Sequence, residues 1–119
     1  VYSLALLSAE AGRIEEAADL LRRSTQLMPW RSRAFFNLAL AEQQLGRLDA
    51  AEEAFRGALE LEPENLDYLS ALADHYARRR NLAGLKEMAE RLESTHPNAP
   101  ITAQVRAVVE QVESGGGGP

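Results

Sequence analysis

The chain has 119 residues, a formal net charge of −5 and no cysteine. Alanine, leucine, glutamate, arginine and lysine make up more than half of it, as in chains built from long helices, and β-branched residues are too scarce for a sheet. The lack of cysteine excludes disulfides and thiolate metal sites, and the acidic balance argues against nucleic acid as a partner. No apolar run is long enough to span a membrane, so we expect no membrane partner. Because the chain opens within a helical pattern and without methionine, we expect it to be part of a longer protein.

One motif recurs along the chain at a step of 34 residues. Gly12 and Gly46 are separated by this step, and so are Pro29, Pro63 and Pro97. Self-similarity at such a period is typical of proteins that stack pairs of helices. We therefore expect three copies of a two-helix unit.

The first copy, at about residues 1–31, is expected to form two helices that meet at Gly12. Glycine favours a helix end because it enters the left-handed conformation without a steric penalty. The second copy, at about residues 32–65, repeats the pattern around Gly46. Pro63 is expected to end the second helix of this copy, since proline cannot donate to the helical ladder.

The third copy, at about residues 66–99, has Arg80 and Asn81 where the other copies have a glycine. Asparagine is the next best residue for such a turn.

The remaining residues predict a seventh helix at about residues 99–114, with Thr102 on its outer face. Its buried face is expected to contain Ala103, Ala107 and Val108, joined by Ile101, Val105 and Val112. Repeat arrays need such a helix to cover their last apolar surface. Residues 115–119 are glycine-rich and are expected to form a flexible linker or tail.

This pattern resembles the tetratricopeptide repeat, which has an aromatic, a leucine, a small residue and a further aromatic on its first helix. Tyr76 is this further aromatic in the third copy, and Glu42 and Ser8 depart from it in the others. An alanine, a phenylalanine, a small residue and a closing proline follow on the second helix. The second copy carries these residues as Phe35, Leu38, Ala39, Ala51, Phe55, Ala58 and Pro63. The resemblance covers about residues 1–97. It implies an all-α domain over residues 1–114, an α-solenoid of seven helices in antiparallel pairs that form a right-handed superhelix.

In this family the first helix of each pair lines the concave side, so the resemblance implies a groove for a peptide or a partner helix. Its apolar half would contain Phe36 and Leu40, and its charged half Asp74 and Arg78. Asn37 stands where many family members hold the peptide backbone. The full candidate set is Tyr2, Leu6, Arg33, Phe36, Asn37, Leu40, Gln43, Gln44, Asp67, Ser70, Asp74 and Arg78.

Two alternatives concern this groove. The apolar members of the set could belong to the core or be covered by further repeats. Family members that clamp a carboxylate use lysine and asparagine on the first repeat and lysine and arginine on the third. This chain has Tyr2, Leu6, Asp67 and Ala71 at those positions, so we do not expect such a clamp.

The sequence offers little for catalysis. His75 and His96, the two histidines, are half a repeat apart and lack convergent partners, so we expect no catalytic residue, no metal site and no cofactor. Arg78, Arg79 and Arg80 form the one basic cluster. They could dock an acidic peptide or an RNA phosphate, but we favour charges that complement a helix end.

The sequence thus predicts a non-catalytic scaffold that binds a protein or peptide partner. One alternative is a structural module that self-associates or stacks on further repeats through an apolar edge at Val1, Leu4 and Leu7. Self-association would give a homodimer. Another is the docking arm of a larger enzyme. Arginine outnumbers lysine twelve to one, which hints at a bacterial coding sequence. The compartment is left open, with the cytoplasm preferred.

Overall fold

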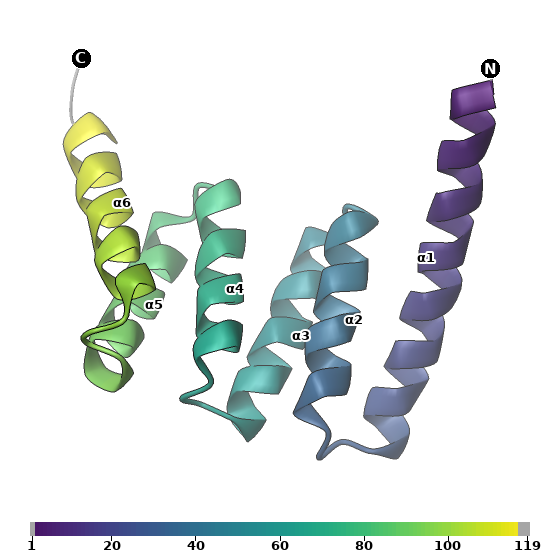
Figure 1. Cartoon of the computed structure of the whole chain (residues 1–119), viewed down its shortest axis with the longest axis horizontal. Coiled ribbons are helices and arrows are strands. Elements are labelled where there is room, and N and C mark those ends of the chain that lie inside the picture. Colours follow the sequence, from purple (N-terminus) through teal and green to yellow (C-terminus); the bar gives the residue numbers. More distant parts are fainter. Residues whose placement is uncertain (1, 117–119) are drawn as a thin grey trace. The chain divides into compact units, whose positions relative to one another are not determined.

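The computed structural model describes the backbone of residues 2–116 and the side chains of residues 12–114 (Figure 1). This part of the chain contains six helices and no strand. The helices are α1 (Tyr2–Leu27), α2 (Ser32–Gln44), α3 (Leu48–Leu61), α4 (Leu66–Arg78), α5 (Leu82–Thr95) and α6 (Pro100–Gly116). They fall into two compact units, Val1–Pro63 with α1 to α3 and Glu64–Pro119 with α4 to α6.

The prediction of seven helices is wrong in the first repeat, because α1 is one helix of 26 residues that passes through Gly12. Glycine permits a turn but does not impose one, and inside a helix it costs only about 1 kcal/mol relative to alanine. In the second repeat the ring of Phe35 packs on the bare backbone of Gly57. The position equivalent to Gly57 in the first repeat is Arg23, whose side chain leaves no bare backbone for a ring of the preceding helix to pack on.

In the second repeat the predicted turn at Gly46 is confirmed. Gly46 has a φ of 77°, in the left-handed region. The amide of Arg47 donates to the carbonyl oxygen of Glu42 at 2.9 Å, and the amide of Gly46 donates to that of Gln43 at 3.0 Å. This pair of hydrogen bonds satisfies two carbonyl groups at the end of α2 and directs the chain into α3.

The core of the first unit lies where α2 packs against α1 on one side and α3 on the other. Phe55, Leu59 and Leu38 provide its large side chains. Alanines occupy most of the remaining buried positions, which lets the helices approach closely: Ala18, Ala34, Ala39, Ala41, Ala51, Ala54 and Ala58.

The second unit makes the same kind of turn without glycine. Arg80 takes the left-handed conformation, with a φ of 56°. The amide of Asn81 donates to the carbonyl oxygen of Tyr76 at 2.9 Å, as Arg47 does in the second repeat. The expectation that Asn81 would serve as a turn residue is corrected, because its side chain accepts from the amide of Gly84 at 3.0 Å and caps α5.

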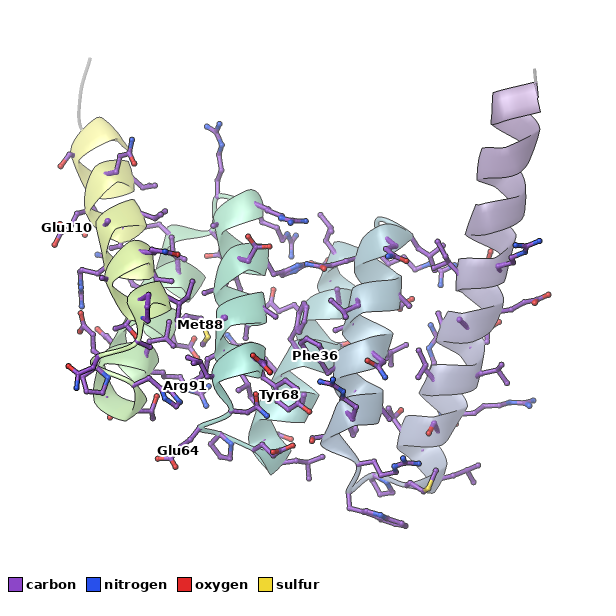
Figure 2. All side chains as sticks on the ribbon, in the orientation of Figure 1. Phe36, Glu64, Tyr68, Met88, Arg91 and Glu110 are labelled. Carbon is purple, nitrogen blue, oxygen red and sulfur yellow. The ribbon has the colours of Figure 1, made fainter. Side chains whose placement is uncertain are left out.

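The core of the second unit centres on Tyr76, whose ring packs against Gly84 so tightly that a Cβ there would lie 2.6 Å from it. Met88 of α5 (Figure 2), Leu72 of α4 and Leu92 of α5 are also fully buried in this unit.

The terminal helix is present as predicted and Val105 is buried as expected, but the rest of its buried face is different. Thr102, Val105 and Val109 are buried, whereas Ala103 and Ala107 are exposed. Thr102 can be buried because its hydroxyl donates to the carbonyl oxygen of His96 at 2.6 Å, so its polar atom keeps a partner. Alanines on several sides of α6 made its phase ambiguous in the sequence.

Candidate functional site

The predicted binding residues of the second repeat lie together on α2. Arg33, Asn37 and Gln44 are exposed, and Leu40 keeps 38% of its surface accessible. These four residues follow each other at steps of three or four, so they form one row along the helix, here named the α2 strip. Gln43 is half-buried beside this row. The other side of α2 is buried.

Phe36 lies at the edge between this surface and the core (Figure 2). Its ring meets that of Phe55 edge to face, with the centres 5.9 Å apart. The guanidinium carbon of Arg33 lies 5.5 Å from the centre of the same ring. Phe36 is half-buried, so it supports the fold as well as the surface.

The predicted residues of the third repeat form a second row, here named the α4 strip. Asp67, Asp74 and Arg78 are exposed and Ser70 is half-buried. Oδ2 of Asp74 is 2.9 Å from Nε of Arg78, one turn along the helix. Such exposed pairs stabilise little because water screens them, so both groups can exchange this contact for one with a ligand.

The predicted binding residues of the first repeat are not placed by the structure. The side chains of Tyr2 and Leu6 lie outside the described residues, as do those of Val1, Leu4 and Leu7.

The sequence analysis missed a buried carboxylate in the first unit. Glu42 is only 3% exposed, and its two oxygens lie 3.2 Å from Nη2 of Arg22 and 3.3 Å from Nη1 of Arg47. Arg47 also reaches Glu15 at 2.9 Å, and Arg22 reaches Asp19 at 2.8 Å. The hydrogen bond to Asp19 and the neighbouring Glu42 raise the pKa of Arg22. The pairs made by Glu42 and Glu15 join α1 to α2 and to the turn after it.

A signal for this cluster was present in the sequence. Glu42 stands 34 residues before Tyr76, at a position where the motif has an aromatic residue. A charged residue at a core position needs a partner of opposite charge.

The histidines take part in the fold. His75 is 1% exposed, and its ring centre is 6.3 Å from that of Tyr76. Nε2 of His96 lies 2.6 Å from the carbonyl oxygen of Glu64. Among the described residues no three potential metal ligands come together. None of the helices in that part of the chain is both long and apolar enough to cross a membrane.

Paired helices joined by the same turn, with exposed rows on α2 and α4, define a helical repeat protein. The profile of a family described as tetratricopeptide repeat matches residues 8–74, more than half of the chain. The chain belongs to the tetratricopeptide repeat family.

Two curated relatives are much longer than this chain. It is 29% identical over 93 residues to Protein CTR9 homolog of Arabidopsis thaliana, covering 77% of this chain and 8% of that protein. It is 29% identical over 114 residues to Cellulose synthase 2 operon protein C of Komagataeibacter xylinus, covering 92% of this chain and 9% of that protein. The chain thus spans less than a tenth of either relative.

Solved structures of similar fold include two chaperone complexes. The Yersinia enterocolitica type III secretion chaperone SycD, in complex with a peptide of the translocator YopD, gives a TM-score of 0.72 at 19% identity, over 97% of this chain and 91% of that chain. PcrH in complex with the chaperone binding region of PopD gives 0.70 at 18% identity, over 97% and 90%. At these identities the likeness shows the fold.

Proposed function

We propose that this chain is a non-catalytic scaffold that binds a peptide or a helix of a partner protein through its exposed helix rows, with the α2 strip as the binding surface of the first unit and the α4 strip as that of the second. The observation that carries the proposal is the α2 strip itself. It presents Leu40 between Asn37 and Gln44, and neither amide side chain forms a hydrogen bond within the described part of the chain. An apolar anchor between such groups suits a peptide whose backbone needs donors and acceptors.

Two further findings support this proposal. Membership in the tetratricopeptide repeat family fits a protein-binding module. SycD and PcrH, which share the fold, are described in complex with a peptide of the translocator YopD and with the chaperone binding region of PopD, respectively.

The proposal is tested by selecting short random peptides displayed on phage against the chain and measuring their affinity by fluorescence anisotropy. Leu40→Asp should weaken binding about tenfold or more, because a buried anchor in an interface contributes at least 1.4 kcal/mol. Leu61→Asp is the matched control, since Leu61 is 40% exposed, like Leu40, and belongs to α3. Failure to select any peptide, or equal weakening by both variants, would contradict the proposal.

Self-association is a second candidate, and exposed apolar residues of α1 and of the turn after it favour it. Leu20, Leu27 and Trp30 are 66%, 75% and 67% exposed, and apolar patches of this kind are uncommon unless they are used. Light scattering over a range of concentrations should then show a dimer that Leu27→Asp dissociates. A constant monomer mass would exclude this candidate.

A third proposal is that the chain is the docking arm of a larger enzyme. It is compatible with the comparisons because the chain matches less than a tenth of the length of either relative.

A further inference from the structure

An apolar groove of about 530 Å³ lies in the second unit, between the end of α4, the start of α5 and the second half of α6. Its apolar walls are Ala77, Leu82, Leu85, Val108 and Val112. A smaller hollow of about 180 Å³ shares three of these residues and extends along α4 to Asp74. The groove therefore continues from the α4 strip.

The phase of α6 explains why this groove is open. Thr102, Val105 and Val109 turn toward the core, which leaves Val108 and Val112 on the flank with 37% and 40% of their surface exposed. Two valines one turn apart on an exposed flank form an apolar surface that a partner can cover. Glu110 projects from the other side of α6 (Figure 2).

Arg80 stands at the end of this groove and lines it. Its left-handed φ of 56° is strained for a residue with a Cβ, and the second repeat has glycine at this place. Backbone strain of this kind recurs at functional sites, where the side chain is needed.

The neighbouring cations Arg78 and Lys86 have carboxylate partners in the described part of the chain, but the charge of Arg80 has none there. Arg78 pairs with Asp74, and on the α5–α6 side Nζ of Lys86 lies 2.8 Å from Oε2 of Glu113. The Arg80 side chain forms no hydrogen bond or ion pair within the described part of the chain. A fixed positive charge beside an apolar wall is complementary to an apolar segment that ends in a carboxylate.

We infer that this groove binds an apolar segment of a partner polypeptide that carries an acidic side chain. The apolar residues of the segment pack on Val108 and Val112, and its carboxylate pairs with Arg80. The inference rests on the proposed function and adds the chemistry of the partner. It also assigns a role to the basic cluster, which the sequence analysis interpreted as helix-end charge.

The test uses two synthetic amphipathic peptides with the same leucine and alanine positions, one with glutamates and one with lysines at the flanking positions. Because the whole chain carries a charge of −5, non-specific attraction would favour the lysine peptide. We expect the glutamate peptide to bind about tenfold more tightly at moderate salt, equivalent to one charge-assisted hydrogen bond. Tighter binding of the lysine peptide would overturn the inference.

Variants locate the binding. Arg80→Gly removes the guanidinium and puts in the residue that the second repeat uses, so the fold is kept. It should abolish the preference for glutamate, whereas Arg23→Ala removes an exposed charge from α1 and should leave the preference intact. Val112→Asp should weaken the glutamate peptide about tenfold. Ala103→Asp, on the exposed opposite side of α6, is its control.

The outcomes separate this inference from the proposed function. If peptides bind without charge preference and only Leu40→Asp weakens them, the scaffold function stands and this inference is wrong. If neither synthetic peptide binds and the random library also yields no ligand, both are wrong.

Discussion

The first and second repeats share the sequence Gly-Arg followed by an aliphatic residue, yet the chain runs straight at one and turns at the other. Gly46 has a φ of 77°, whereas Gly12 lies inside α1 (Figure 1). The difference lies in what the following helix offers. Phe35 packs on Gly57 in the second repeat, and the first repeat has Arg23 at that position. A glycine thus permits the turn, and side-chain packing decides whether it forms.

The consequence of the continuous helix is an uncovered face. Leu20 is 66% exposed, whereas Ala54, its equivalent in the second repeat, is 5% exposed. Leu27 and its equivalent Leu61 are 75% and 40% exposed. Where a neighbouring helix covers the position, as at Ala54, the residue is small. Where no helix covers it, as at Leu20, a leucine side chain stays exposed on α1.

The largest effect is expected where the second repeat is covered. Phe55→Ala should lower the free energy of unfolding by about 3–5 kcal/mol, because it removes a fully buried ring and leaves a cavity. Leu20→Ala on the uncovered face should change it by less than about 0.5 kcal/mol. Urea unfolding followed by circular dichroism measures both. Comparable losses would mean that α1 is covered as α3 is.

Three glycines within helices should respond with opposite signs to alanine. A Cβ at Gly57 or Gly84 would lie 2.6 Å from the ring of Phe35 or Tyr76, so each substitution should destabilise by about 1–3 kcal/mol. Gly12 has no atom within 4 Å of a Cβ, so Gly12→Ala should stabilise by up to about 1 kcal/mol. Thermal unfolding of the three variants tests this, and a loss at Gly12 would indicate a turn there.

The ion pairs that join α1 to α2 should contribute less. Glu42→Gln keeps the shape of the side chain and removes its charge, which should destabilise by about 1–2 kcal/mol. Glu15→Gln breaks the exposed ion pair of Glu15 with Arg47, which also pairs with Glu42, and should lower the free energy of unfolding by less than about 0.5 kcal/mol. Equal effects in urea unfolding would show that burial of Glu42 adds nothing.

The smallest effect compares the two turns. Arg80→Gly should stabilise by about 0.5–1 kcal/mol, because it relieves a left-handed residue, and Gly46→Ala should destabilise by about 1 kcal/mol. The change in melting temperature of each variant reports the sign. A loss of stability in Arg80→Gly would mean that the arginine side chain stabilises the turn.

The sequence predicts well what periodicity controls and poorly what side-chain packing controls. The turn at Gly46, the burial of Leu38 and Phe55 and the terminal helix all follow from the repeat. The continuity of α1 does not, because it depends on the side chain at position 23. The phase of α6 was also missed, since alanines mark no single face.

The candidate site shows the same division. The rows on α2 and α4 follow from helical spacing. The groove beside Arg80 does not, because it depends on which residue takes the left-handed conformation and on which flank α6 exposes. The buried position of Glu42 was readable only by comparison with Tyr76.

The most direct test of the difference between the repeats is an assignment of the 13Cα chemical shifts around Gly12 and Gly46 in one NMR spectrum. Helical shifts that continue through Ala11, Gly12 and Arg13, with an interruption at Gly46, are the expected result. An interruption at Gly12 like that at Gly46 would contradict the account. It would mean that the first repeat closes as a helix pair and covers the leucines of α1.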